Sequence, residues 1–177
     1  MRLFIAVDFP AEVKQALFEV SSELIRQADA GRIIPLDNFH ITLVFIGESE
    51  RVTDIQDTMG AVCRAELADP LRLVFSGIGS FKSRKGYTWW VGMEANPELE
   101  RLANRLAEEL RSQGFAIEKR AFKPHVTIGR AVFASRAVDL ALPKLELVTS
   151  TVSLMRSDHK NGRQVYREIF SCNPLSF

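Results

Sequence analysis

The stretch that decides the fold is Phe39-His40-Ile41-Thr42-Leu43-Val44-Phe45, which is echoed later in the chain by Pro124-His125-Val126-Thr127-Ile128-Gly129-Arg130. Both segments are rich in β-branched and aromatic residues, so each predicts a buried strand. Side chains alternate along a strand, so each His and the Thr two places later lie on one face. The apolar residues between them point the other way. Each strand therefore offers an imidazole and a hydroxyl side by side.

A polar pair in so apolar a strand must face something polar. A single His of this kind is most often a hydrogen-bonded core residue. Here two of them occur in the same strand context, 85 positions apart (125 − 40). This repetition favours a shared functional site over two unrelated core histidines.

The two halves of the chain match around these motifs. A predicted strand begins at 2 and again at 87, a helix-opening proline stands at 10 and at 97, and the motif His at 40 and at 125, which gives offsets of 85, 87 and 85. We therefore expect two copies of a strand-helix-strand unit related by a pseudo-twofold axis. That axis would bring both His into one central cleft.

The remaining segments complete this plan. We expect one helix from Pro10 to near Gly31, a second after Gly47 capped by Thr53, and a third capped by Asn96. Residues 77–86, with glycines and three basic side chains, predict a loop. Residues 145–155 and 164–170 predict two strands joined by a polar turn over 157–163.

The composition is that of an ordinary globular protein. Of 177 residues, 46% are apolar and 25% charged, and the segment 1–7 is too short for a signal peptide. We therefore expect a cytoplasmic protein without a membrane partner. Residues 1–70 hold 6 Lys/Arg against 12 Asp/Glu, a balance of −6, and the remainder holds 17 against 10, a balance of +7. A local anion site fits this asymmetry better than a surface coat for nucleic acid.

The two cysteines, Cys63 and Cys172, stand in neither a Cys-x-x-Cys nor a Cys/His ligand spacing. Redox and structural zinc roles therefore lack support, and we expect both thiols to be inert and mostly buried.

Paired His and Thr side chains suit phosphate chemistry. Imidazole has an ordinary pKa near ~6.5, so one ring of a pair can be neutral while the other is protonated. That supplies an acid and a base in one site. The hydroxyls of Thr42 and Thr127 could hold two non-bridging phosphate oxygens. This chemistry needs neither a metal nor another cofactor, and we expect none.

The residues that carry chemistry resemble those of the 2H phosphoesterase superfamily. Its RNA 2′,3′-cyclic phosphodiesterase (LigT-like) branch is similar at residues 2–7, 38–48 and 124–130, and the likeness runs essentially from 1 to 170. The resemblance implies an α+β fold, bilobal, with two mostly antiparallel sheets and flanking helices. It also implies one domain over 1–177, with His-x-Thr-x motifs at 40–43 and 125–128.

The resemblance also implies roles for these residues. His40 would be the proton donor that protonates the leaving 3′ oxygen, and His125 the proton acceptor that activates water. The implied enzyme is an RNA 2′,3′-cyclic 3′-phosphodiesterase that yields a 2′-phosphomonoester. Its partner would be an RNA with a cyclic phosphate end, such as a tRNA fragment, or a cyclic nucleotide. We expect it to act as a monomer.

The resemblance also implies that Arg130 contacts the phosphate. Plain strand alternation turns its side chain away from His125 unless Gly129 permits a bulge, and a surface salt bridge is an equal alternative.

Three further groups of residues have both a functional and a structural interpretation. Basic side chains could steer RNA, although charged loops are usually only solvated. Aromatic side chains could stack a base, although core packing is commoner. His159 lacks a Thr two places on and has no predicted role. The basic candidates are Lys82, Arg84, Lys85, Lys119, Arg120 and Lys123, and the aromatic ones are Phe9, Phe39 and Trp90.

Other functions remain open to the sequence. The same site could act on small cyclic nucleotides or join tRNA halves through a 2′–5′ linkage. A non-catalytic RNA-end binder is a second class, but Arg or Lys would serve binding equally well. A two-His metal hydrolase lacks a third His or a clustered carboxylate.

Overall fold

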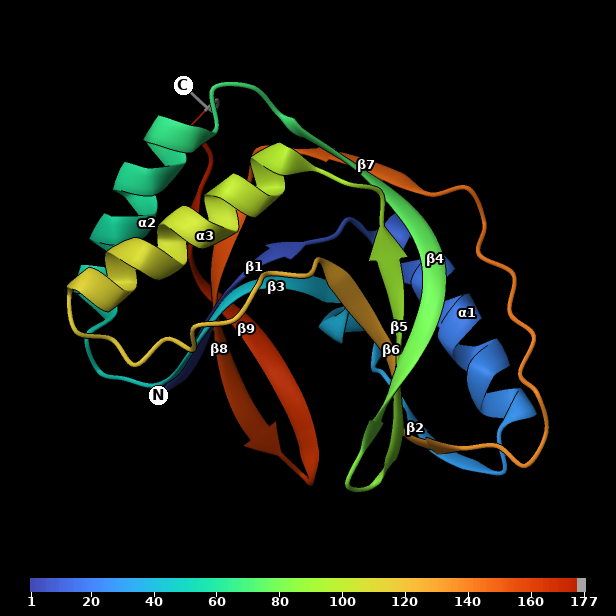
Figure 1. The fold of residues 1–177 in the computed structure, drawn as a ribbon. Helices are drawn as coiled ribbons and strands as arrows, with labels where there is room; N and C mark the ends of the chain where they lie inside the picture. The colour runs from blue at the N-terminus through green and yellow to red at the C-terminus, as the bar shows by residue number, and fades with distance from the viewer. Residues whose placement is uncertain (175–177) are drawn as a thin grey trace.

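Nine strands form two antiparallel sheets in residues 1–174, the part of the chain that the computed structural model describes (Figure 1). The strands are β1 (Arg2–Asp8), β2 (Ala30–Ile33), β3 (His40–Glu48), β4 (Leu71–Ser83), β5 (Gly86–Met93), β6 (His125–Phe133), β7 (Glu146–Thr149), β8 (Val152–Lys160) and β9 (Arg163–Cys172). The helices are α1 (Ala11–Gln27), α2 (Val52–Glu66) and α3 (Pro97–Ser112), with a short 3₁₀ helix η1 (Leu36–Asn38).

The two sheets repeat one strand order. The first sheet runs β3-β1-β8-β9 and the second β2-β6-β5-β4-β7. Strands β3, β1, β8 and β9 therefore occupy the places of β6, β5, β4 and β7, and within residues 1–174 the second sheet has β2 as an extra strand at its edge. The motif strands β3 and β6 span 40–48 and 125–133, which keeps the 85-residue offset along their whole length. The predicted α+β fold with two related antiparallel sheets is therefore confirmed.

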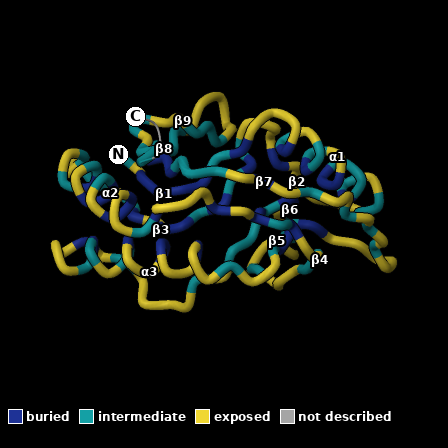
Figure 2. Tube along the Cα trace, turned by 90° about the horizontal axis from the view of Figure 1, so that it is seen from above, coloured by how far each residue is buried: buried dark blue, intermediate teal, exposed yellow. Residues whose placement is uncertain are grey.

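The helices are exchanged between the two sheets. Helix α1 follows β1 of the first sheet but packs on β6 and β2 of the second, while α3 follows β5 of the second sheet and packs with α2 beside β3 of the first (Figure 1). Leu17 and Leu24 of α1 and Leu102 and Leu106 of α3 are fully buried in one common core. The buried segments accordingly run through the centre of the molecule (Figure 2). The sequence predicted the helices but not this exchange.

Of the two helix caps predicted at Asn96 and Thr53, only the one at Asn96 forms. Asn96 caps α3 as predicted, since its side chain accepts a hydrogen bond of 2.8 Å from the Leu99 backbone N–H, and Pro97 opens the helix. The cap predicted at Thr53 is wrong, because α2 begins after Arg51 without any side-chain cap. There the Arg51 guanidinium makes one local and one tertiary contact: it pairs with Asp54 at 2.7 Å and lies 4.3 Å from the Phe115 ring centroid.

The loop predicted over 77–86 is also wrong. Strand β4 continues to Ser83, and only residues 84 and 85 turn the chain into β5. Gly77 has φ 74° at a register shift between Phe75 and Ile78, so the glycine serves a bulge inside the strand. The basic side chains of this segment lie at or near the tip of an exposed hairpin.

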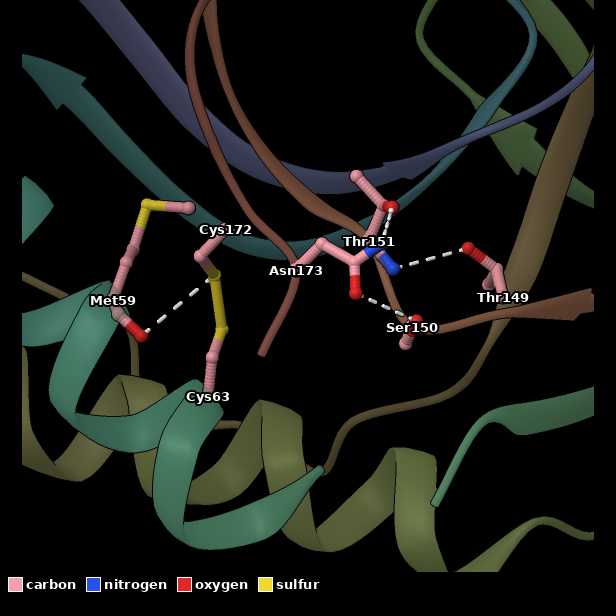
Figure 3. Close-up of a disulfide and its surroundings, with 7 residues drawn as sticks. All are labelled: Met59, Cys63, Thr149, Ser150, Thr151, Cys172 and Asn173. Carbon is pink, nitrogen blue, oxygen red and sulfur yellow. Dashed lines mark hydrogen bonds between the residues drawn. A yellow bond between two sulfur atoms is a disulfide. The ribbon is translucent and has the colours of Figure 1, made fainter. Parts of the chain in front are cut away.

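A single strand over 145–155 does not form. The segment divides into β7, which pairs with β4 of the second sheet, and β8, which pairs with β1 of the first. The crossing is fixed by hydroxyl groups: Ser150 Oγ donates to Asn173 Oδ1 at 2.8 Å, and the Thr151 N–H donates to Thr149 Oγ1 at 3.1 Å (Figure 3). The predicted polar turn over 157–163 shrinks to residues 161 and 162, both with positive φ.

The cysteines are not independent thiols. The structure joins Cys63 of α2 to Cys172 of β9 in a disulfide, with the two Cα atoms 6.8 Å apart (Figure 3). Cys63 is buried as expected, whereas Cys172 is only half-buried. The separation of 109 positions hid this pairing from spacing patterns.

Within residues 1–174, the helices are all too short or too polar to cross a membrane.

Candidate active site

In the first sheet, strand pairing defines which residues share the face of His40. Asp8 lies opposite His40, and Ala6 lies opposite Thr42, across the β1–β3 ladder. Residues opposite one another in a ladder project from the same side. We call this side of the sheet its histidine face. It also carries a small apolar cluster, separate from the main core, that contains Phe4 and Ala6.

In the second sheet the same rule places Gly92 opposite His125 and Trp90 opposite Thr127. These residues form the histidine face of that sheet. The predicted sharing of one face by His and Thr therefore holds in both motifs. Strands β3 and β6 approach each other where the two sheets meet.

The His40 ring is held by both nitrogens. Its Nδ1 is 2.8 Å from the carbonyl oxygen of Asn38, and its Nε2 is 3.0 Å from Thr42 Oγ1. The ring also packs against Phe4 and Tyr166, with centroids 4.9 and 5.1 Å away. Such packing fixes the orientation of the ring on the histidine face.

His125 repeats the first of these contacts. Its Nδ1 is 2.7 Å from the carbonyl oxygen of Lys123, also two positions back in the chain. A carbonyl can only accept, so Nδ1 carries a proton in both His40 and His125. Each neutral ring then presents an unprotonated Nε2, the nitrogen that can take a proton. The two motifs thus fix the same tautomer.

The surroundings of His40 disfavour its charged form. Burial lowers the pKa of the His40 imidazole to about 4, against the opposing effects of the Asn38 carbonyl and the Asp8 carboxylate. The positive charges of Arg130 and Lys14 lower this pKa further. His40 is therefore neutral near pH 7 while no anion is bound.

Arg130 lies on the histidine face because β6 contains a bulge. Thr127 pairs with Trp90 and Gly129 with Trp89, so β6 has one extra residue at this point. An extra residue reverses the alternation that follows it, which returns Arg130 to the side of Thr127. Arg130 could reach this face only if Gly129 permitted a bulge, and that bulge forms.

The charge of Arg130 reaches the first sheet. It acts on the imidazole of His40 and on the hydroxyl of Tyr166, both of which belong to the other sheet. Arg130 itself is exposed and, among the ion pairs of residues 1–174, it takes part in none. An unpaired guanidinium beside an imidazole favours an anionic ligand.

The chain as a whole is similar to known proteins. The family model of the 2′-5′ RNA ligase superfamily matches residues 13–161. The chain belongs to this superfamily. The resemblance seen in the motifs is thereby confirmed at the level of the family.

Relatives in the 2′-5′ RNA ligase superfamily cover nearly the whole chain. An RNA 2′,3′-cyclic phosphodiesterase of Thermotoga maritima is 28% identical over 97% of this chain and 95% of its own. One from Thermus thermophilus is 31% identical over 94% of this chain and 86% of its own. The crystal structure of TT0787 of Thermus thermophilus superposes with a TM-score of 0.83 at 29% identity, over 97% and 96% of the two chains.

Two further residues of the candidate site, Tyr166 and Phe45, were not predicted from the sequence. Tyr166 of β9 packs edge-on against His40 from 126 positions away (166 − 40), and burial raises the pKa of its hydroxyl. Phe45 follows a bulge in β3 equivalent to that in β6, is 44% exposed, and lies 5.1 Å from the Arg2 guanidinium. Phe45 precedes Arg130 by the same 85 positions that separate the two motif His, and this offset could have predicted that Phe45 occupies the equivalent place in β3. Nothing in the sequence marks Tyr166.

The structure distinguishes the remaining candidate residues by how far each is buried. Phe9 and Phe39 are 5% and 1% exposed in the main core, so the core interpretation is right for both. Trp90 is half-buried on the histidine face. His159 lies exposed in β8.

Over residues 1–174, no three His, Cys, Asp or Glu side chains are grouped so as to hold a metal ion.

The bulge in β6 depends on α1. Ser21 of α1 is fully buried, and its hydroxyl donates to the carbonyl oxygen of Ile128. A Cβ at Gly129 would lie 2.6 Å from Leu24 Cδ2, so a glycine lets α1 approach the bulge closely. The helix therefore holds the backbone that aims Arg130.

We expect Ser21→Ala to lower the free energy of unfolding by about 1 to 3 kcal/mol, because the buried Ile128 carbonyl loses its partner. Urea unfolding measures this loss. The matched control is Ser22→Ala, whose hydroxyl bonds to the Phe18 carbonyl within the same helix and is only partly buried. Equal losses in the two variants would contradict a special role for the Ser21 contact.

Acid should destabilise the protein through His40. The pKa of this ring is 6.5 ordinarily and about 4 in the folded protein, so between these values the unfolded chain binds a proton that the folded one does not. Stability therefore falls as the pH drops through this window, by roughly 2 to 3 kcal/mol at its end. Unfolding at pH 7 and pH 4.5 should show a smaller loss in His40→Gln than in the parent protein. A similar loss in both would rule out the burial penalty.

Proposed function

We propose that this protein hydrolyses RNA 2′,3′-cyclic phosphate ends to 2′-phosphomonoesters by acid–base catalysis with His40 and His125, without a metal. The observation that carries the proposal is the matched pair of rings, each with Nδ1 tied to a carbonyl two positions back. A fixed tautomer leaves Nε2 as the one nitrogen able to exchange a proton with substrate. The names of the relatives from Thermotoga maritima and Thermus thermophilus support the same reaction.

In the proposed reaction His125 Nε2 takes a proton from water, which attacks the phosphorus. His40 Nε2 donates a proton to the 3′ oxygen as its bond to phosphorus breaks. The 2′ oxygen keeps the phosphate. At the end His125 is protonated and His40 neutral, so the two rings must exchange protons with solvent before the next turnover.

The low pKa of His40 places a condition on this reaction. Near pH 7 the ring is neutral in the free enzyme, because burial lowers its pKa to about 4. A phosphate anion next to the ring would favour the imidazolium, since an opposite charge within ~4–6 Å raises the pKa of a base. Substrate binding would thus protonate His40, so the charged ring that donates the proton would exist only while substrate occupies the site.

Three side chains are suited to hold the phosphate. The hydroxyls of Thr42 and Thr127 share the faces of the two His, and Arg130 points to the same side. Two donors and one cation can take the non-bridging oxygens, while His40 acts on the leaving 3′ oxygen and His125 on the attacking water.

The name of the family favours one second candidate, the joining of RNA halves such as tRNA fragments through a 2′–5′ linkage. Ligation would use the same groups in the same roles: His125 would take the proton of a 5′ hydroxyl of RNA in place of water, and His40 would protonate the leaving 3′ oxygen. The fate of a cyclic-phosphate oligonucleotide with and without a second RNA bearing a free 5′ hydroxyl distinguishes the two reactions.

The test of the proposal is an oligonucleotide ending in a 2′,3′-cyclic phosphate, incubated with the protein and EDTA. We expect full hydrolysis in the chelator and a 2′-phosphate as the sole product, read by chromatography against 2′- and 3′-phosphate standards. Loss of activity in EDTA that a divalent ion restores would favour a metal hydrolase. A 3′-phosphate would reverse the assignment of the leaving oxygen, and binding without turnover would favour an RNA-end binder.

A further inference from the structure

A cavity of about 480 Å³ adjoins the second motif. It is lined by residues of β4 and β5, by the start of α3 and by the segment that leads into His125. Two of its lining residues, Lys123 and Pro124, directly precede that histidine, and Gly92 is its cross-strand partner. The acid–base chemistry proposed above uses none of this space, although its volume is typical of a small-molecule site.

The floor of the cavity is an indole that lies along the sheet. A Cβ at Gly79 would fall 2.3 Å from Trp90 Cζ2, and one at Gly92 would fall 3.2 Å from Trp90 Cζ3. Opposite ends of the ring therefore rest over two glycines on neighbouring strands. Because glycine has no side chain, the indole can lie against the backbone. Trp90 stays half-buried and lines the cavity with its free surface.

The polar lining of the cavity disfavours a second phosphate. Glu94 and Glu100 are both exposed and both line it, against the single cation Lys123. Two carboxylates repel an anion but can accept hydrogen bonds from N–H groups. Phe122 adds a second aromatic side chain to the lining. These surroundings suit a flat, uncharged aromatic ring with N–H donors at its edge.

We infer that this cavity binds the nucleobase of the nucleotide that carries the cyclic phosphate, stacked on Trp90. The inference rests on the proposed function and extends it to the substrate's base. Trp90 lies directly opposite Thr127, a proposed phosphate contact, and directly opposed residues have Cβ atoms about 4.5–5.5 Å apart. That separation suits the base of the same nucleotide, since a base and its own 2′,3′-phosphate share one ribose.

The kinetic test compares two substrates, adenosine 2′,3′-cyclic phosphate and the same ribose cyclic phosphate without a base. Stacking is worth roughly 1–3 kcal/mol per base, which corresponds to a change of about 5- to 150-fold. Trp90→Leu should raise KM for the adenosine substrate by such a factor and leave KM for the abasic substrate unchanged. Trp90→Phe should keep part of the effect. The matched control is Trp89→Leu, because Trp89 packs against the main core.

Equal KM changes with both substrates, or no change with either, would overturn the inference, because a structural tryptophan does not distinguish a base from its absence. If the parent protein hydrolyses neither substrate and also leaves an oligonucleotide with a 2′,3′-cyclic phosphate end intact, the proposed function fails instead. A binding measurement then tests whether the cavity binds a nucleobase, independently of turnover.

That measurement uses Trp89→Phe, which leaves Trp90 as the one indole of the chain's two. Adenosine 2′-monophosphate should quench its fluorescence in a saturable way, whereas inorganic phosphate should not. An unchanged signal at nucleotide concentrations that bind the protein by calorimetry, or equal responses to nucleotide and phosphate, would overturn the inference.

Discussion

His40→Ala and His125→Ala should each lower kcat by about 10²–10⁴-fold at pH 7, and the double variant should be little worse than either single one. In the proposed mechanism the two rings act in one proton-transfer sequence, so the loss of one leaves the other without its complement. Initial rates on a cyclic-phosphate oligonucleotide measure the effect. His159→Ala is the matched control, since His159 is exposed in β8. Losses that multiply in the double variant would show independent roles, and a folded single variant with near-parent turnover would make its His structural.

A modified substrate separates the two roles. If His40 protonates the leaving 3′ oxygen, a substrate with sulfur at that bridging position should rescue His40→Ala, because a thiolate leaves without a proton. The same substrate should not rescue His125→Ala, which lacks the base that activates water. Rescue of His125→Ala instead would exchange the roles, an outcome that the low pKa of His40 makes worth testing.

Thr42→Val and Thr127→Val should each cost about 2 to 4 kcal/mol of transition-state stabilisation, the value of one donor to a developing phosphate charge. Valine keeps the shape of threonine and its preference for a strand, so the fold should be retained. The quantity to measure is kcat/KM, with thermal unfolding as the check on folding. Thr53→Val is the control, because Thr53 is exposed on α2.

The two threonines should also differ in one respect. Thr42 Oγ1 is 3.0 Å from His40 Nε2, so Thr42→Val removes a partner of the ring as well as a phosphate donor. We expect its pH profile of kcat/KM to shift relative to the parent profile, and that of Thr127→Val to keep the parent shape. Unchanged kcat/KM in both variants would remove the hydroxyls from the proposed site.

The sequence by itself determined the features that depend on short-range pattern. Strand alternation placed each His beside its Thr and turned Ile41 and Val126 into the core, where both are fully buried. The cap at Asn96 was equally local, because the residues that form it are three positions apart. The 85-residue offset then predicted two related strand-helix-strand units without any knowledge of their packing.

Only the tertiary structure decided which of these elements meet. The β6 bulge that aims Arg130 depends on Ser21 of α1, 107 positions from Ile128, and the low pKa of His40 depends on its burial, to which Tyr166 of β9 contributes. The same is true of the strand that splits at Ser150 between two sheets. A local pattern fixes the direction of a side chain relative to its own strand. Long-range packing determines what lies opposite that side chain, how far water is excluded from it, and hence which proton it can carry.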